Sequence, residues 1–160
     1  MQYRVEPLGL QHDREAFCCG NDAIDAFCQQ AYRDHAQFRK RIYVACESDA
    51  HIVIGYYALV MTQITSGRAK KHTDPAVQIE MVGVTKTYQA RGVGKLLVAH
   101  ALHQVYVVAQ TVGAIWVWLR AADRKVADFY IQLGFHWLDE KQLKLYLPIE
   151  DIISLIDSER

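Results

Sequence analysis

The sequence predicts an α/β domain built around one central sheet, and three observations support this prediction. The chain has 160 residues, about the size of one domain. Its hydrophobic fraction of 51% and charged fraction of 22% suit a globular core. Strand-like and helix-like patterns follow one another in the order β-α-β-β-β-α-β-α-β-β, with no repeat and no linker. We therefore expect residues 1–160 to form a single domain.

The first part of the chain predicts a short strand and a helix. Tyr3–Glu6 has the pattern of the strand, which ends at Pro7. Either Asn21 or Asp22 can cap a helix N-terminus. Apolar residues then recur three and four positions apart, at Ile24, Phe27, Cys28, Ala31 and Tyr32. This stripe is typical of an amphipathic helix, and it fades in the basic stretch Arg39–Arg41.

The middle of the chain predicts three strands and one long loop. Ile42–Cys46 and Ile52–Met61 have strand composition, and the polar residues between them suit a hairpin turn. Gln63–Ala76 is polar and contains a glycine and a proline, so we expect a loop there. The strand Gln78–Val84 follows this loop.

The rest of the chain predicts two longer helices, three strands and a last helical turn or two. These elements are expected at Val93–Gln110, Ile115–Leu119, Asp123–Leu133, Phe135–Leu138, Leu143–Leu147 and Ile149–Ile156. Asp123 can cap the second of these helices, and Gly134 suits the position that follows its last turn.

Charge and hydropathy exclude several classes of protein. Eighteen basic and eighteen acidic residues give a formal net charge of zero. This excludes bulk electrostatic attraction as the main way of binding nucleic acid or membrane, although a local patch remains compatible with it. No apolar run approaches the ~18–20 residues that span a bilayer. No basic start followed by an apolar stretch suggests a signal peptide. We expect a cytoplasmic protein that does not bind membranes.

Cysteine and histidine spacing predicts no metal site. The four cysteines form no C-x-x-C pair and are Cys18, Cys19, Cys28 and Cys46. We expect free thiols, some of them buried. His100 and His103 have no third ligand at a matching spacing, so a half-exposed helix face is the simpler interpretation.

A loop with two glycines, between a strand and a helix, carries the strongest functional signal. Residues 89–95 contain the pattern Q-x-x-G-x-G. Glycines let the backbone approach a ligand and aim successive N–H groups at it, and the helix N-terminus adds partial positive charge. The spacings of a dinucleotide fingerprint and of a P-loop are both absent. The loop predicts an anion site; the alternative is a turn that needs glycine only for its geometry.

Two motifs resemble the signature of the GNAT superfamily of N-acetyltransferases. The family loop Q/R-x-x-G-x-G/A, whose amides grip the pyrophosphate of acetyl-CoA, matches Gln89, Ala90, Arg91, Gly92, Val93, Gly94 and Lys95. Residues 123–135 match N-x-x-A-x-x-F-Y-x-x-x-G-F, with Asp123 for the usual Asn and Val126 for the usual Ala. The resemblance implies a mixed, mostly antiparallel sheet of six to seven strands, flanked by helices and splayed at Gln78–Val84. It also implies acetyl-CoA as co-substrate, without a metal.

Other segments resemble the acetyltransferase toxins of bacterial type II toxin–antitoxin pairs. Residues 17–27 resemble their F-x-C-G-x-x-x-L-D-x-F opening, Gly55–Leu59 their G-Y-Y-x-L strand, and Leu145–Pro148 their L-x-L-P ending. The toxins usually have L-G-R-L-A-V before the loop, whereas Ile79–Val84 contains Glu and Met in place of the Gly and Arg. The resemblance implies that the chain acetylates the α-amine of aminoacyl-tRNA and so blocks translation. It further implies a homodimer and a small ribbon-helix-helix antitoxin.

The resemblance also assigns roles to single residues. Tyr130 matches the tyrosine that protonates the departing CoA sulfur; the alternative is a core tyrosine. Residues expected to contact the cofactor outside the loop are Val82, Gly83, Val84, Asp123, Val126 and Phe129. Among these, a backbone N–H of Val82 or Val84 would meet the thioester oxygen.

Glu80 is the candidate base for the acceptor amine, because strand alternation places it on the face of Val82 and Val84. The alternative is an edge carboxylate in solvent, with the proton passing directly to water.

Two basic clusters, Arg39-Lys40-Arg41 and Arg68-Lys70-Lys71, could seat an RNA backbone or could be solvated surface charges. Two other functions remain open for the whole chain. It could be an ordinary acetyltransferase of a small amine or a protein N-terminus. It could also be a catalytically silent acetyl-CoA-binding module with a regulatory role.

Overall fold

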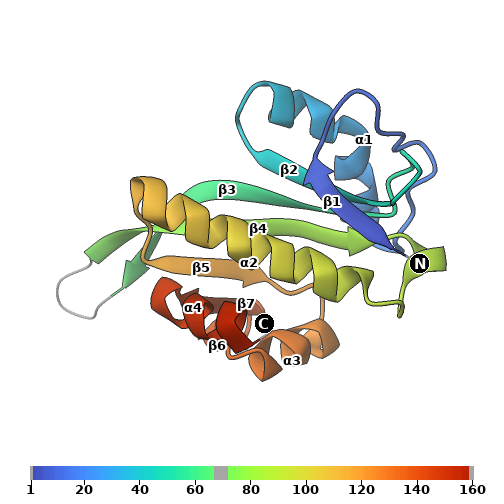
Figure 1. The fold of residues 1–160 in the computed structure, drawn as a ribbon. Helices are drawn as coiled ribbons and strands as arrows, with labels where there is room; N and C mark the ends of the chain where they lie inside the picture. Colours follow the sequence, from blue (N-terminus) through green and yellow to red (C-terminus); the bar gives the residue numbers. More distant parts are fainter. Residues whose placement is uncertain (1, 67–71, 159–160) are drawn as a thin grey trace. The chain divides into compact units, whose positions relative to one another are not determined.

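The strands that the structure describes form one seven-stranded sheet in the order β1-β2-β3-β4-β5-β7-β6. The computed structural model describes residues 2–66 and 72–158. Its strands are β1 (Tyr3–Pro7), β2 (Arg41–Glu47), β3 (Gly55–Ser66), β4 (His72–Val84), β5 (Trp116–Arg120), β6 (His136–Asp139) and β7 (Lys144–Pro148). Its helices are α1 (Asp22–Ala36), the short 3-10 helix η1 (Lys86–Tyr88), α2 (Val93–Val112), α3 (Arg124–Gln132) and α4 (Ile149–Ser158) (Figure 1).

The sheet is mixed, as the sequence predicts. β4 and β5 run parallel. The other described ladders, β1–β2, β2–β3, β5–β7 and β6–β7, are antiparallel. The expected order of strands and helices is therefore confirmed along the described residues.

Contacts divide the chain into two units. Unit 1 comprises Met1–Val60 and Glu80–Ala101, and unit 2 comprises Met61–Ile79 and Leu102–Arg160. Unit 1 thus contains β1, β2, α1, the last part of β4, η1 and the first half of α2. Unit 2 contains β5, β6, β7, α3 and α4.

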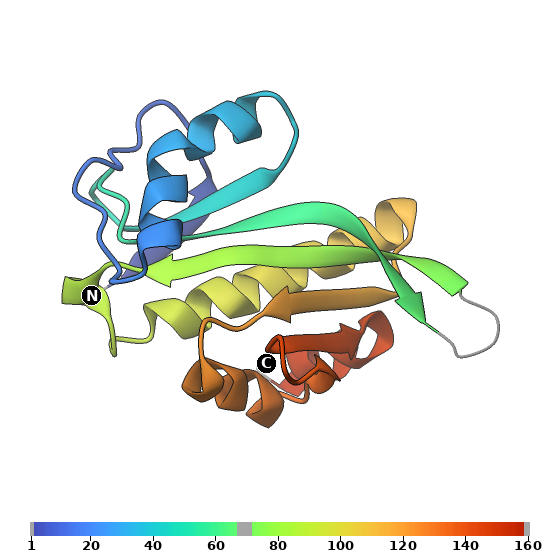
Figure 2. The same cartoon turned by 180° about the vertical axis from the view of Figure 1, so that it is seen from behind.

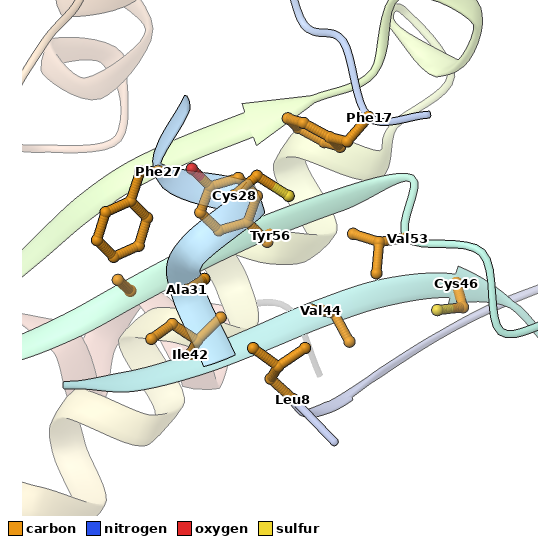
Figure 3. Packing of buried hydrophobic residues seen from close by; sticks show 11 residues of the cluster. Leu8, Phe17, Phe27, Cys28, Ala31, Ile42, Val44, Cys46, Val53 and Tyr56 are labelled. Carbon is orange, nitrogen blue, oxygen red and sulfur yellow. The ribbon is translucent and has the colours of Figure 1, made fainter. Parts of the chain in front are cut away.

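The core of unit 1 lies between α1 and the strands that follow it (Figure 3). The helix contributes Phe27, Cys28 and Ala31, which are spaced as the predicted stripe requires. The Asn21 side chain accepts hydrogen bonds from the N–H groups of Ala23 and Ile24. Asn21, and not Asp22, therefore caps this helix.

The core of unit 2 lies on one face of β5 and β7. Val117 pairs with Leu147 and Leu119 with Leu145, and all four side chains are buried. Their neighbours along the strands, including Trp116, are half-buried on the opposite face. The apolar alternation of β5 thus fixes which side of this strand faces the core.

The prediction of a loop at Gln63–Ala76 is wrong for most of these residues. β3 continues to Ser66 and β4 begins at His72, so most of this polar stretch belongs to strands. Ile64 is buried within it. Threonine favours strands despite its polarity, and a strand with one open face needs few apolar residues. Polar composition alone therefore misassigned the segment.

Candidate active site

The ladder between β4 and β5 ends five residues before β4 does. It pairs Ala76–Ile79 with Trp116–Leu119, whereas β4 continues to Val84. Within the continuation, Met81 has a φ of +55°. This left-handed conformation is rare for a residue with a side chain, and in a strand it marks a bulge-like irregularity that interrupts pairing. The predicted splay of this strand is confirmed, and it starts after Ile79.

Gly83 leaves room for α1 to pack against β4. A Cβ atom at this position would lie 2.6 Å from Ile24 Cγ2. Met81 packs against the same α1 cluster. Val84 instead approaches the first turn of α2, since a Cβ atom at Gly94 would lie 3.9 Å from Val84 Cγ2. The last residues of β4 therefore connect α1 on one side with the start of α2 on the other.

Glu80 is ion-paired with one of the predicted substrate residues. Lys40 Nζ donates to Glu80 Oε2 at 2.6 Å, and both side chains are mostly buried. The same ammonium group lies 5.1 Å from the centre of the Phe27 ring. Glu80 is therefore held toward the α1 cluster. Glu80 reaches the α1 cluster whereas Val84 approaches α2, so these two side chains do not share a face; the face of Val82 stays a prediction.

The glycine loop presents a run of unused backbone donors. Figure 2 shows β4 leading into η1 and then into α2. Ala90 and Gly92 have φ values of +62° and +86°. From Ala90 to Lys95, no N–H group donates to an atom of the described chain. These donors stand at the N-terminus of a 20-residue helix, whose dipole attracts anions.

The Gln89 side chain ties this loop to two other segments. Its Nε2 donates to the carbonyl of Val84 at 2.8 Å and to that of Cys19 at 2.9 Å. Thr85 bonds back to Cys18 through its hydroxyl, at 3.1 Å. The segment before α1 thus fixes the end of β4 and the start of the loop. The sequence pattern identified Gln89 but could not show partners up to 70 residues away.

Arg91 is positioned by a tyrosine that the sequence analysis did not single out. Its guanidinium lies 5.0 Å from the centre of the Tyr88 ring. The Tyr88 hydroxyl donates to the Glu47 carboxylate, and this hydrogen bond raises the pKa of Tyr88. Arg91 therefore stands at the edge of the loop with its charge exposed.

The cysteines near the loop are poor nucleophiles. All four are unbridged. Burial raises the pKa of Cys19 to about 11, with a further contribution from Asp25. Burial likewise raises the pKa of Cys28 to about 12 and that of Cys46 to about 11. Because the thiolate is the reactive form, these three thiols do not support an acyl-enzyme mechanism.

Tyr130 lies in unit 2, on α3. Asp123 Oδ1 caps this helix by accepting from the N–H of Val126 at 2.9 Å, as predicted. The Tyr130 ring packs edge-on against Phe129 and Phe135, and only 4% of the residue is exposed. Burial raises the pKa of its phenol.

The remaining predicted residues fall into three groups. Arg39 and Lys40 lie in the connection between α1 and β2, and Arg41 is the first residue of β2. Arg68, Lys70 and Lys71 lie outside the described residues. His100 Nδ1 meets the Tyr57 hydroxyl at 2.7 Å, and His103 is exposed.

The described ranges contain no cluster of three or more His, Cys, Asp or Glu side chains that could hold a metal ion. Within the same ranges, no helix has both the length and the apolar character needed to cross a membrane.

Comparison with protein families gives a match to the acetyltransferase (GNAT) domain over residues 38–136. Two relatives match nearly the whole chain. "Probable toxin TacT" of Sinorhizobium fredii (strain NBRC 101917 / NGR234) is 30% identical, over 95% of this chain and 94% of the relative. The "tRNA-acetylating toxin" of Mycobacterium tuberculosis (strain ATCC 25618 / H37Rv) is 24% identical, over 90% of both chains.

Solved structures with the same fold include three forms of the AtaT toxin. One is a tyrosine-to-phenylalanine mutant bound to the C-terminus of the antitoxin AtaR, with a TM-score of 0.83, 28% identity and coverage of 96% and 97%. AtaTR bound with acetyl-CoA has a TM-score of 0.84, 26% identity and the same coverage. AtaT complexed with acetyl-methionyl-tRNAfMet has a TM-score of 0.84, 25% identity and coverage of 96% and 99%.

Proposed function

The chain belongs to the GNAT family of N-acetyltransferases, and on this premise we propose that it acetylates the α-amine of aminoacyl-tRNA with acetyl-CoA. The modified amine can no longer accept a peptide, so the protein acts as a toxin that blocks translation. The relatives named as toxins, and the AtaT complex with acetyl-methionyl-tRNAfMet, support this choice of acceptor. Because charged tRNA is its substrate, we place the protein in the cytoplasm.

The run of free amides from Ala90 to Lys95 carries the cofactor part of the proposal. Consecutive N–H groups at a helix N-terminus suit the oxygens of a pyrophosphate. The exposed side chains of Arg91 and Lys95 add two positive charges beside them. Acetyl-CoA contains such a pyrophosphate, and AtaTR is known with acetyl-CoA bound.

Direct transfer needs two groups from the protein. The amine nitrogen attacks the thioester carbon, a C–N bond forms, and the C–S bond breaks. A backbone N–H of Val82 or Val84 stabilises the oxyanion of the tetrahedral intermediate. Tyr130 gives its phenolic proton to the departing sulfur, and the proton of the amine passes to water. Burial raises the pKa of the Tyr130 phenol and so keeps it protonated until that step.

A strong protein base is not required for this acceptor. An aminoacyl α-amine is less basic than a lysine side chain, so part of it is neutral near pH 7. The Glu80 carboxylate is engaged by Lys40. We therefore assign Glu80 to holding Lys40 and β4 in position, and assign deprotonation of the amine to solvent.

The proposal also includes partners. A small ribbon-helix-helix antitoxin would cover the toxin, as the AtaT complex with AtaR suggests. A homodimer is part of the same proposal. Light scattering of the purified protein tests the homodimer, and co-purification with a candidate ribbon-helix-helix protein tests the antitoxin.

The decisive experiment is incubation of the protein with labelled acetyl-CoA and total charged tRNA. Label is expected on aminoacyl ends. If label moves instead to polyamines or to peptide N-termini, the chain is an ordinary acetyltransferase and the tRNA proposal is overturned. If acetyl-CoA binds but label moves to no acceptor, the chain is a silent binding module.

A further inference from the structure

Phe38 occupies a position where a helix end normally carries glycine. α1 ends with two bonds of the Schellman type: Phe38 N–H donates to the His35 carbonyl at 3.1 Å, and Arg39 N–H to the Asp34 carbonyl at 3.0 Å. This motif places Phe38 in the left-handed region, at a φ of +58°. The corresponding positions after α2 and α3 are occupied by Gly113 and Gly134.

The phenylalanine adds almost nothing to the core in return. Its Cβ makes the left-handed conformation unfavourable, whereas glycine adopts it readily. Phe38 is 80% exposed, so it contributes almost nothing to the core. A strained and exposed aromatic side chain indicates a role outside folding.

One cation contacts the exposed ring, and a second is adjacent in sequence. The Arg41 guanidinium lies 5.0 Å from the centre of the Phe38 ring, and it bonds to the His35 carbonyl at 3.2 Å and to His35 Nε2 at 3.1 Å. Arg39, the residue after Phe38, is exposed, and its Nε donates to Gln37 Oε1 at 3.0 Å. Neither arginine has a carboxylate partner in the ranges 2–66 and 72–158. Lys40, between them, is neutralised by Glu80.

An exposed aromatic ring beside unpaired arginines matches the chemistry of single-stranded RNA. Bases stack on aromatic rings with little regard to sequence, and arginines contact the backbone phosphates. Bases inside a duplex are already stacked, so such a ring selects unpaired nucleotides. The net charge of zero also favours a small contact over a long duplex footprint.

We propose that Phe38 stacks on an unpaired base at the acceptor end of the charged tRNA, with Arg39 and Arg41 beside its phosphates. The assignment rests on the proposed function. It separates the roles of the basic stretch: Arg39 serves RNA, Arg41 serves RNA while also bonding to His35 at the end of α1, and Lys40 serves the fold.

Steady-state kinetics of Phe38→Gly test this proposal. Loss of one base stack is expected to raise the KM for charged tRNA roughly 5- to 150-fold. kcat and the KM for acetyl-CoA stay at wild-type values, and the unfolding midpoint is unchanged or higher because glycine relieves the strain. Phe38→Trp retains tRNA affinity, whereas Phe38→Leu, which keeps the strain without the ring, loses it. Leu10→Ala, at an equally exposed apolar side chain, is the matched control and has no effect.

Salt dependence separates stacking from charge. Phe38→Gly leaves the slope of log Kd against log salt unchanged, while Arg39→Ala and Arg41→Ala each lower it by about one. A wild-type KM for charged tRNA in Phe38→Gly overturns the proposal. If Phe38→Gly weakens only the binding of the antitoxin, the proposal is also overturned, because the ring would then contact a protein and not RNA.

Anisotropy with a short labelled RNA ending in CCA keeps the test independent of acetylation. If the wild-type protein acetylates no charged tRNA, the proposed function fails. In that case, weaker binding of the labelled RNA by Phe38→Gly than by the wild-type protein would still support stacking on Phe38. Equal binding by the two proteins would overturn it.

Discussion

Lys40 Nζ lies 2.6 Å from Glu80 Oε2, so a residue expected to contact RNA and a residue expected to act as a base neutralise each other. About a quarter of the Lys40 side chain and a fifth of the Glu80 side chain are exposed. A pair at this depth is poorly solvated, and removing one partner leaves the other charge without compensation. The pair joins the start of β2 to the irregular segment of β4.

Glu80→Gln is expected to lower the free energy of unfolding by about 1–2 kcal/mol, because Lys40 stays partly buried without a counter-charge. kcat should fall less than tenfold, and the pH–rate profile should keep its shape. Chemical denaturation and a kinetic pH series measure the two effects. The double variant Lys40→Met with Glu80→Leu, which removes both charges, recovers most of the lost stability. A hundredfold loss of kcat with the basic limb shifted would instead make Glu80 the base.

Tyr130→Phe should reduce kcat by about 10²- to 10⁴-fold, the usual contribution of a positioned general acid. Phenylalanine keeps the ring that packs against Phe129 and Phe135, so the unfolding midpoint and the Kd for acetyl-CoA stay close to wild type. Calorimetric titration and rapid-quench kinetics check these values. Tyr106→Phe, at a half-buried tyrosine of α2, is the control. If the Tyr130→Phe enzyme keeps its activity, Tyr130 is not the general acid and is only a core tyrosine.

The two loop glycines should respond differently to alanine. Gly92 has a φ of +86°, so Gly92→Ala costs about 1–2 kcal/mol of strain or distorts the loop. We expect at least a tenfold rise in the Kd for acetyl-CoA, at roughly 1.4 kcal/mol per factor of ten. Gly94 lies inside α2, where a Cβ would make an ordinary contact with Val84.

Gly94→Ala is therefore expected to keep acetyl-CoA affinity and to stabilise the fold by up to about 1 kcal/mol, through helix propensity. Titration calorimetry and thermal melts of both variants, side by side, measure this contrast. Equal losses of affinity in the two variants would show that the loop needs flexibility at both positions and not one left-handed residue.

Local signals in the sequence predicted most of the fold. Asn21 and Asp123 cap the helices that they were expected to cap, because a capping bond involves only neighbouring residues. The pairing of Lys40 with Glu80 spans 40 residues and has no local signature. The irregularity at Met81 could not be predicted either, since methionine has no preference for a left-handed conformation.

Phe38 went unnoticed for the opposite reason. A helix end normally signals its left-handed position with glycine, and a phenylalanine there carries no such signal. The position of β4 next to α2 could be predicted from the motif, whereas the bonds from Gln89 to Cys19 could not. Long-range contacts between short loops depend on the assembled fold, and they account for most of what the sequence missed.

His35 should make the fold sensitive to mild acid. Its Nδ1 accepts from the N–H of Ile42 at 2.9 Å, and only 7% of the residue is exposed. Burial, followed by the charge of Arg41, lowers the pKa of His35 in the folded protein. The unfolded chain therefore binds a proton more readily below about pH 6.5, the ordinary pKa of histidine, and stability falls as the pH drops through that value.

One such proton changes the unfolding free energy by at most about 1.4 kcal/mol per pH unit. Thermal melts between pH 8 and 5.5 should show this loss in the wild-type protein. His35→Asn keeps an acceptor for Ile42 N–H but cannot titrate, so its midpoint should vary much less over that range. His103→Asn, at an exposed histidine, should retain the wild-type slope. If His35→Asn and the wild-type protein lose stability in parallel, the acid sensitivity comes from other groups and His35 is merely a buried acceptor.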